Sequence, residues 1–267
     1  MKAGPGLLST LRSLIQLMRG RPRVPPSLKE NPLLQVIMNR RSVRSFSDRP
    51  IPEDVFAAIL EAARLAPSTV NMQTWAFAVF DERSWMQTFN RPIPFHGARA
   101  VIVIADTYRD RQVLEMFPYS PLVENNVAVM NASLAAMNMN IAAEALGVSS
   151  VMLSETGRSG LLDAGYLAQV LGLPTGAIPL MTIVFGYARG PYPPMPPKLP
   201  PEQIFFTGRY AAPQPETMQA WLNQMRAGYK ASHPGSSFEN QIKIYLSKIE
   251  QAEADLQRMV FHQKSEP

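Results

Sequence analysis

The sequence contains no cysteine and only three histidines among its 267 residues. The lack of cysteine excludes disulfides, thiolate metal sites and thiol catalysis. The histidines, His96, His233 and His262, are scattered, and this argues against a histidine-rich metal site or a Ser-His-Asp triad. We therefore expect no metal site, and catalysis by this chain would depend on a bound cofactor that carries the reactive group.

Long apolar runs are also missing, so we expect no membrane-spanning helix. The segment Leu7–Met18 has apolar residues at helical spacing, but polar residues interrupt it and RGRPRVPP follows, which is not typical of a signal peptide. We expect an amphipathic helix that docks on its own domain or on a partner subunit. Peripheral contact with a membrane is the alternative. Together these features favour a cytoplasmic protein.

Acidic residues are scarce in the first part of the chain. Residues 1–49 carry ten Lys or Arg against only Glu30 and Asp48, which gives a net charge of +8. Because the whole chain carries +5, the remaining 218 residues carry −3. A near-neutral body with a basic N-terminal part indicates one local anion site or a basic arm, not a large polyanion-binding surface. We expect no nucleic-acid partner, although binding of nucleic acid through residues 1–29 stays open as an alternative.

Proline, with 25 residues, divides the chain. One proline-containing connector lies between residues 22 and 32, and a second stretch has seven prolines within 191–201. We expect a basic amphipathic arm over 1–30, a ligand-binding domain over 31–207 and a helical extension over 208–267.

Hydrophobic periodicity predicts helices and strands that alternate between the two proline-containing stretches. Strands are expected over 75–80, 100–105, 148–153 and 178–187. Helices are expected over 32–39, 52–66, 121–146, 158–171, 215–230 and 238–262.

The predicted helix over 121–146 has only two charged residues, Glu124 and Glu144. A long helix with almost no charged face is buried on nearly all sides. A second subunit that covers one face would supply that burial, so we expect a homodimer. Coverage by the sheet and helices of a single chain is the alternative.

The segment Arg40-Arg41-Ser42-Val43-Arg44 places three guanidiniums and a hydroxyl within five residues. In an extended chain Arg40, Ser42 and Arg44 would point to one side and Arg41 to the other. Arginine binds phosphate oxygens through paired donors and keeps its charge when desolvated, so the cluster fits a phosphate-bearing ligand. A solvated basic loop is the alternative.

A second polar segment, APSTVNMQTW over 66–75, follows a predicted helix and leads into a predicted strand. Its side chains Ser68, Asn71 and Gln73 offer neutral donors and acceptors, which suit the edge of a heterocycle. Ordinary turn formation by serine and asparagine is the alternative.

Taken together, these segments resemble the nitroreductase family of flavin mononucleotide (FMN) enzymes, which includes iodotyrosine deiodinase. The resemblance follows the order RRSVRSF, APSTVNMQTW, a long Ala/Asn-rich helix that ends in AAEALGVSSVML, FGYA and PKLP, and it covers roughly residues 31–207. It implies an α+β nitroreductase-like fold with a central mixed β-sheet flanked by helices. It also implies an intertwined homodimer that binds FMN.

By position, the resemblance implies two groups of phosphate-side ligands. Arg40, Arg41, Ser42 and Arg44 would hold the flavin phosphate, the ribityl chain and the pyrimidine edge. Lys198 would be a second phosphate ligand.

The resemblance also implies contacts to the flavin ring. Ser68 and Asn71 would reach it from the partner subunit, with Pro67 shaping the loop and Gln73 nearby. The stretch beside flavin N5 maps to Ser154-Glu155-Thr156, where hydroxyls replace the commoner glycine-rich forms, as in the deiodinase-like version. A capping role for Glu155 at the following helix is the alternative.

The function implied by this resemblance is reduction of a nitroaromatic, quinone or enone acceptor by NAD(P)H in a ping-pong cycle. No side chain need act as general acid or base, because the flavin carries the hydride. The sequence has no GxGxxG or GxxxxGK[ST] string, so it gives no signal for a separate Rossmann or P-loop site. A dehalogenase-like or flavin-consuming member of the same family and a flavin-binding protein without turnover are the alternatives.

Overall fold

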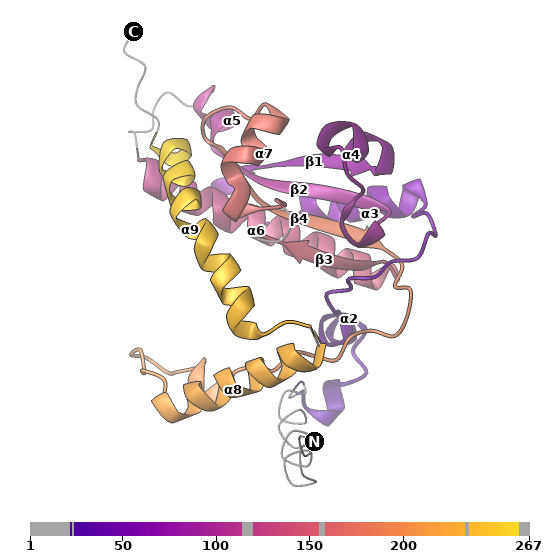
Figure 1. Ribbon diagram of the computed structural model, residues 1–267, viewed down its shortest axis with the longest axis vertical. Helices are drawn as coiled ribbons and strands as arrows, with labels where there is room; N and C mark the ends of the chain where they lie inside the picture. The colour runs from indigo at the N-terminus through magenta and orange to yellow at the C-terminus, as the bar shows by residue number, and fades with distance from the viewer. Residues whose placement is uncertain (1–21, 23, 114–119, 155–157, 233–234, 262–267) are drawn as a thin grey trace. The chain divides into compact units, whose positions relative to one another are not determined.

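The computed structural model describes residues 22, 24–113, 120–154, 158–232 and 235–261 (Figure 1). The chain divides into two compact units, one formed by Glu30–Pro193 with Ser247–Pro267 and the other by Met1–Lys29 with Pro194–Leu246. The helix predicted over Leu7–Met18 lies outside the described residues. No helix in the described part of the chain is long and apolar enough to cross a membrane.

The first unit is built on a four-stranded sheet. Its spatial order is β1 (Trp75–Asp81), β2 (Arg99–Asp106), β4 (Ala177–Gly186) and β3 (Ser149–Leu153) (Figure 1). All four predicted strands are confirmed to within two residues at each end.

The predicted α+β class is confirmed, but the sheet differs from the mixed sheet that was expected. All three strand pairs are antiparallel. Strands β1 and β4 run in the same direction, as do β2 and β3, yet each such pair is separated by an intervening strand. Within the described residues, parallel pairing is limited to the isolated bridge between Ser42 and Ser150.

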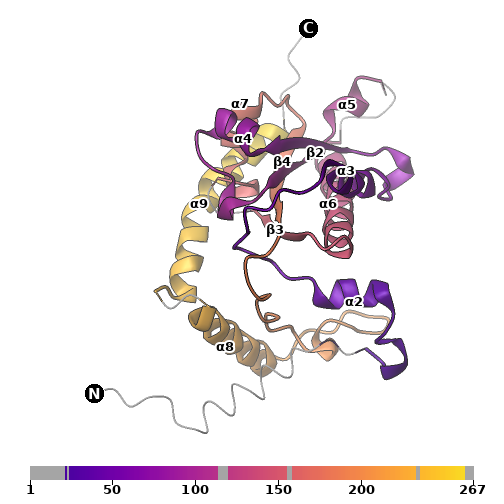
Figure 2. The same cartoon turned by 90° about the vertical axis from the view of Figure 1, so that its right-hand side faces the viewer.

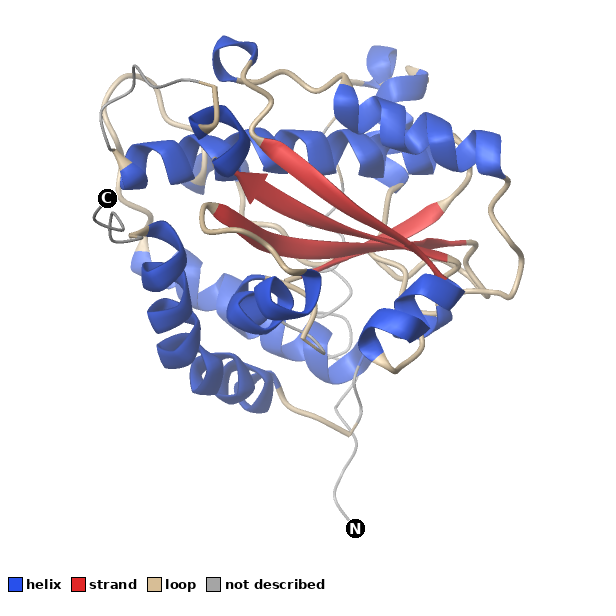
Figure 3. Cartoon of the chain, turned by 90° about the horizontal axis from the view of Figure 1, so that it is seen from above, coloured by secondary structure: helices blue, strands red, loops and turns tan. Residues whose placement is uncertain are grey.

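Helices cover both faces of the sheet (Figure 3). α3 (Glu53–Arg64) and α6 (Pro121–Ala145) lie side by side on one face (Figure 2), and α4 (Glu82–Phe89) and α7 (Ala164–Leu171) pack on the other. Residues 101, 103 and 105 of β2 join the first of these cores, and residues 100, 102 and 104 join the second. Because alternate side chains enter two different cores, β2 is a continuous apolar run.

Local signals explain where most helices begin. α2 (Pro32–Asn39) starts as predicted because the Asn31 side chain accepts the Leu34 N–H at 3.1 Å and Pro32 suits the first turn. α7 starts six residues after the predicted position of 158, because Gly160 pairs with Met181 and a short 3-10 turn follows. Among the described residues, two α-helices were not predicted, α4 and the short α5 (Tyr108–Arg111).

Among the described residues, α6 buries one of its faces and leaves another exposed. Its buried face is made mainly of alanines, together with Asn131, Met139 and Asn140. The exposed apolar side chains of the same helix are Leu122, Val123, Met130, Leu134 and Met137. The described elements of one chain therefore do not surround this helix, which goes against the alternative that the sheet and helices of a single chain cover it.

The second unit contains α8 (Pro215–Ser232) and the first part of α9 (Phe238–Val260). Arg226 forms an ion pair with Glu239 at 2.7 Å, and the Tyr229 and Phe238 rings lie 6.0 Å apart. The last part of α9, from Ser247, belongs to the first unit, where Lys248 Nζ lies 2.9 Å from Asp163 Oδ2.

Candidate functional site

The arginine segment, residues 40–46, runs beside the edge strand β3. Ser42 forms a bridge with Ser150, and the Val43 N–H donates to the Ser150 carbonyl at 3.0 Å. The Val43 side chain is buried in the core. Because side chains alternate along an extended chain, Ser42 and Arg44 point away from that core.

The same segment continues across the end of β4. The Ser47 N–H donates to the Tyr187 carbonyl at 2.8 Å. Phe46 is buried against Gly186, where an added Cβ would lie 2.8 Å from the Phe46 ring. A side chain at position 186 would therefore displace the ring. The structure thus brings the RRSVRSF and FGYA motifs into contact.

The three arginines differ in what they contact. Arg41 Nη1 donates to the carbonyls of Met38 at 2.7 Å and Arg40 at 2.8 Å, and so satisfies acceptors at the end of α2. Arg44 is exposed and makes one long contact of 3.4 Å with the Ser42 carbonyl. The half-buried Arg40 side chain has no hydrogen bond or ion pair with any described residue. Arg40 and Arg44 therefore keep donors for an anion, whereas Arg41 serves the helix end.

A carboxylate from α6 lies in the electrostatic field of two of these arginines. Glu144 Oε2 accepts from the Tyr192 hydroxyl at 3.4 Å, and this hydroxyl is 2.9 Å from Ser149 Oγ. Burial raises the pKa of Glu144, and this outweighs the opposing effects of the Tyr192 hydrogen bond and the charges of Arg40 and Arg41. Glu144 is therefore easier to protonate than a carboxylate in water.

The loop over 68–73 has an unusual backbone. Val70, Asn71 and Gln73 have φ angles of 52°, 58° and 53°, in the left-handed region that side chains rarely adopt. The Ser68 hydroxyl accepts the Gln73 N–H at 3.0 Å, which leaves its own proton for another acceptor. Asn71, Gln73 and the preceding Pro67 are exposed, and Ser68 is half-buried. The loop therefore presents neutral polar groups in a fixed arrangement.

The arginine segment and this loop lie at opposite corners of the sheet. The loop precedes Trp75 at the start of β1, which is one edge strand. The arginine segment lies beyond β3, the other edge strand, level with the far end of β1. Four strand spacings of about 4.8 Å across the sheet and six residues of about 3.4 Å along it put them roughly 25–30 Å apart. One chain therefore does not bring the two predicted halves of the site together.

The remaining predicted ligands are distributed over both units. Ser154 is exposed directly after β3, and Gly160 packs so closely on its backbone that an added Cβ would lie 2.5 Å from the Ser154 Cα. Glu155 and Thr156 lie outside the described residues. Lys198 is exposed and belongs to the second unit, whereas the arginines belong to the first. The roles of these four residues stay predictions.

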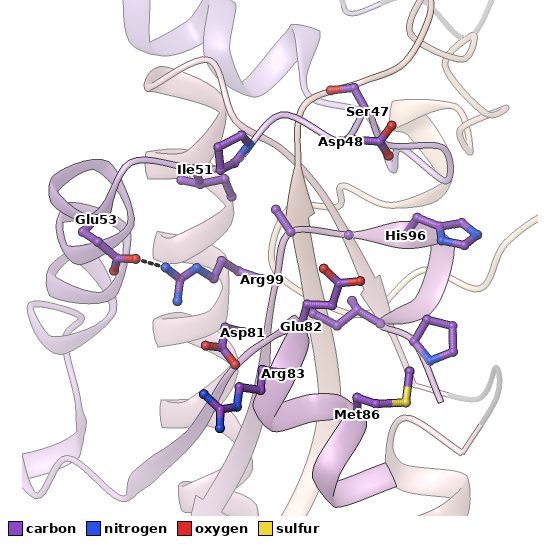
Figure 4. Close-up of a pocket in the computed structure, with 15 residues that line it drawn as sticks. Ser47, Asp48, Ile51, Glu53, Asp81, Glu82, Arg83, Met86, His96 and Arg99 are labelled. Carbon is purple, nitrogen blue, oxygen red and sulfur yellow. Dashed lines mark hydrogen bonds and ion pairs between the residues drawn. The ribbon is translucent and has the colours of Figure 1, made fainter. Parts of the chain in front are cut away.

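A pocket of about 700 Å³ lies near the C-terminal end of β1 (Figure 4). Three of its charged groups have structural partners: Arg99 pairs with Glu53, and Asp81 accepts the Ser84 N–H at 2.7 Å to cap α4. No flavin ligand predicted among the described residues lines this pocket. The described residues also contain no cluster of three or more His, Cys, Asp or Glu side chains placed to hold a metal ion.

One buried hydrogen-bond network was not predicted. Asn131 of α6 and Thr74, which are only 1% and 4% exposed, bond to each other, with Asn131 Nδ2 donating to Thr74 Oγ1 at 2.8 Å. The Asn131 carbonyl oxygen accepts the Thr69 N–H at 3.1 Å. An amide on the alanine-rich face of a helix is the sequence signal that would have suggested such a network, because buried amides need partners.

Comparisons with known proteins agree with this architecture. The sequence model of the nitroreductase family matches residues 37–93 and 87–187. A protein from Archaeoglobus fulgidus, named as a candidate NADH dehydrogenase/NAD(P)H nitroreductase, is 33% identical over 162 residues, which cover 58% of this chain and 85% of that protein. The FMN reductase (NADPH) of Bacillus subtilis is 27% identical over 191 residues, which cover 67% of this chain and 75% of that protein.

A solved structure shares the fold. The structure of the NADPH:FMN oxidoreductase from Vibrio harveyi complexed with NAD+ superimposes with a TM-score of 0.66 and 20% sequence identity. The superposition covers 81% of this chain and 92% of the Vibrio chain. The likeness in fold therefore extends well beyond the segments that carry the sequence motifs.

Proposed function

This chain belongs to the nitroreductase family, and from that premise we propose that it is an FMN-dependent oxidoreductase that takes electrons from NAD(P)H. The relatives named NAD(P)H nitroreductase and FMN reductase (NADPH) support this cofactor and this electron donor. The acceptor in the proposal is an organic molecule of the nitroaromatic, quinone or enone type.

The residues present fit FMN. A phosphate needs fixed positive charge, and Arg40 and Arg44 keep donors that no described residue occupies. The edge of a heterocycle needs neutral donors and acceptors, which Ser68 and its loop offer. When bound, FMN would supply the hydride chemistry that no amino-acid side chain provides. The protein's own residues would bind the cofactor, orient it and exclude water.

The observation that carries the proposal is the separation of the arginine segment from the loop. Because they lie roughly 25–30 Å apart in one chain, a cofactor that touches both draws them from two chains. A two-fold dimer would place the loop of one protomer beside the arginines of its partner. The exposed apolar face of α6, which includes Met130, Leu134 and Met137, supports such a homodimer.

Two measurements on the purified protein test this proposal. The first is the visible absorbance gained on mixing with FMN followed by gel filtration, which also reports the oligomeric state. The second is anaerobic bleaching of the flavin absorbance by NADH or NADPH, and its return on adding nitro, quinone, enone or haloaromatic acceptors. We expect a dimer that retains FMN and passes electrons from NAD(P)H to at least one acceptor.

Each contrary outcome has a distinct meaning. A protein that retains no FMN would overturn the proposal. Retention of FMN without bleaching by either nicotinamide would instead identify a flavin-binding protein without turnover. Release of halide from a haloaromatic acceptor under limiting oxygen would identify the dehalogenase-like alternative.

A further inference from the structure

Asn131 connects the loop over 68–73 to helix α6 at both ends of that loop. Its carbonyl oxygen accepts the Thr69 N–H at 3.1 Å and lies 3.4 Å from the Thr69 hydroxyl. Its Nδ2 donates to the Thr74 hydroxyl at 2.8 Å. One side chain, 1% exposed, therefore fixes the residue after Ser68 and the residue after Gln73.

The loop needs such an anchor because its own backbone is strained. Three of its residues have positive φ angles, and one of them is Val70, whose β-branched side chain is especially unfavourable there. Strained conformations persist only where the surrounding structure holds them. The hydrogen bond from the Gln73 N–H to Ser68 Oγ closes the loop on itself at 3.0 Å but does not attach it to the domain. Within the described residues, the side-chain hydrogen bonds from this loop to the rest of the fold go to Asn131.

α6 also carries the exposed face that supports a dimer. Met130, the neighbour of Asn131, is 53% exposed, and Leu134 is 43% exposed one turn further on. The buried amide and the exposed apolar side chains thus come from two adjacent turns of one helix. A helix is stiff over this length, so the loop is held in register with the surface that would meet the partner subunit.

We propose that Asn131, through Thr69 and Thr74, is a positioning residue that holds Ser68 and Asn71 in the geometry that binds the flavin of the partner subunit. This inference rests on the proposed function. Asn131 itself does not touch the cofactor in this arrangement. Its removal should therefore alter the placement and affinity of the flavin by loosening the loop.

The experiment compares Asn131→Ala with Asn138→Ala. Asn138 lies on the same helix and donates to the Ala62 carbonyl of α3 at 3.0 Å, so it anchors the helix to a different element. For each variant we would measure the dissociation constant of FMN, the thermal midpoint of the FMN-free protein and the visible circular dichroism of the bound flavin. We expect Asn131→Ala to weaken FMN binding by about tenfold, the scale of one buried hydrogen bond, and to change the dichroism. Asn138→Ala should lower the thermal midpoint but leave both flavin readouts unchanged.

Substitutions at Thr74 keep the test decisive if Asn131→Ala fails to fold. Thr74→Val removes only the hydroxyl that accepts from Asn131, and should reproduce the weaker FMN binding in part. Thr74→Ser keeps that hydroxyl and should restore wild-type binding. In the double variant Asn131→Ala/Thr74→Val, the second substitution should add no further loss, because both residues act through one network.

The outcomes separate this inference from the proposed function. Wild-type FMN affinity and dichroism in folded Asn131→Ala or Thr74→Val, together with weaker binding in Ser68→Ala, would overturn the role of Asn131 and leave the flavin site in place. Equal losses of FMN affinity in Asn131→Ala and Asn138→Ala would also overturn it, by showing a general effect of helix stability. A wild-type protein that binds no FMN would overturn the proposed function itself.

Discussion

The arginine segment and the loop over 68–73 present their polar groups by different physical means. The arginine segment attaches to β3 through the backbone of Val43. Among the described residues, the long contact of Arg44 with the Ser42 carbonyl is the one hydrogen bond made by the Arg40 and Arg44 side chains. The loop instead has a strained backbone held by a buried amide. The attraction between opposite charges extends over several ångströms and changes little when the groups shift slightly. Neutral hydrogen bonds, in contrast, require accurate distances and angles. We infer that the arginines contribute most of the cofactor affinity and the loop most of its orientation.

The largest loss of FMN affinity is expected from substitution of Arg44. Arg44→Ala should weaken FMN binding by about 1.5–3 kcal/mol, the scale of a hydrogen bond to a charged group, and Lys198→Ala should do the same. Part of the loss should disappear at high salt, since screening weakens the wild-type contact as well. Fluorescence titration of FMN at two salt concentrations measures both effects.

Arg41→Ala is the matched control for that measurement. Arg41 carries the same charge, but its Nη1 already donates to the end of α2. Its removal should lower the thermal midpoint of the FMN-free protein and reduce FMN affinity less than Arg44→Ala does. An equal loss of affinity in both variants would contradict the distinction that the structure draws between them.

A smaller loss of FMN affinity is expected from a substitution in the loop. Ser68→Ala should weaken FMN binding by about 0.5–1.5 kcal/mol, the usual contribution of a neutral hydrogen bond. The loss should be nearly independent of salt, because no charge is removed. The same FMN titrations at two salt concentrations test this prediction. If the loss of FMN affinity in Ser68→Ala depended on salt as strongly as the loss in Arg44→Ala, the proposed difference between the loop and the arginines would be wrong.

The smallest effect concerns the carboxylate near the arginines. Burial raises the pKa of Glu144, so the folded protein holds that proton more tightly than the unfolded chain does. Its contribution to stability is full below the unfolded pKa and falls as the pH rises through the folded value. Glu144→Gln should therefore stabilise the protein at neutral pH relative to about pH 3, where Glu144 is largely protonated in both states. Thermal midpoints across this range measure the effect.

The same variant bears on the cofactor. Loss of a negative charge near Arg40 and Arg41 should tighten binding of a phosphate group by a few-fold, as expected for a partly screened charge. Weaker FMN binding in Glu144→Gln would show that the carboxylate supports the arginines instead of competing for them.

Much of the fold could be predicted because its signals are local. The start of α2 is encoded by Asn31 and Pro32, and the strands are short apolar runs bounded by polar residues. α4 was not predicted, and its Trp85 and Phe89 are stabilised by tertiary contact with Phe80 of β1. The order of strands in the sheet depends on contacts far apart in the sequence, so periodicity could not distinguish antiparallel from mixed pairing.

The candidate site shows the same limit of local information. Motif spacing indicated the arginine segment and the loop, but not that Arg41 turns back to the carbonyl of Met38. The hydrogen bond between Thr69 and Asn131 joins residues 62 positions apart, so no local pattern reveals it. Side-chain roles that depend on such long-range contacts required the structure.

The corner-to-corner placement of the two segments has a genetic consequence. If each flavin is held by the arginines of one chain and the loop of another, defects in the two segments complement each other. A heterodimer of an Arg44→Ala chain and a Ser68→Ala chain would concentrate both defects in one of its sites and leave the second site intact. Two impaired variants expressed together would then show more activity at limiting FMN than either has alone.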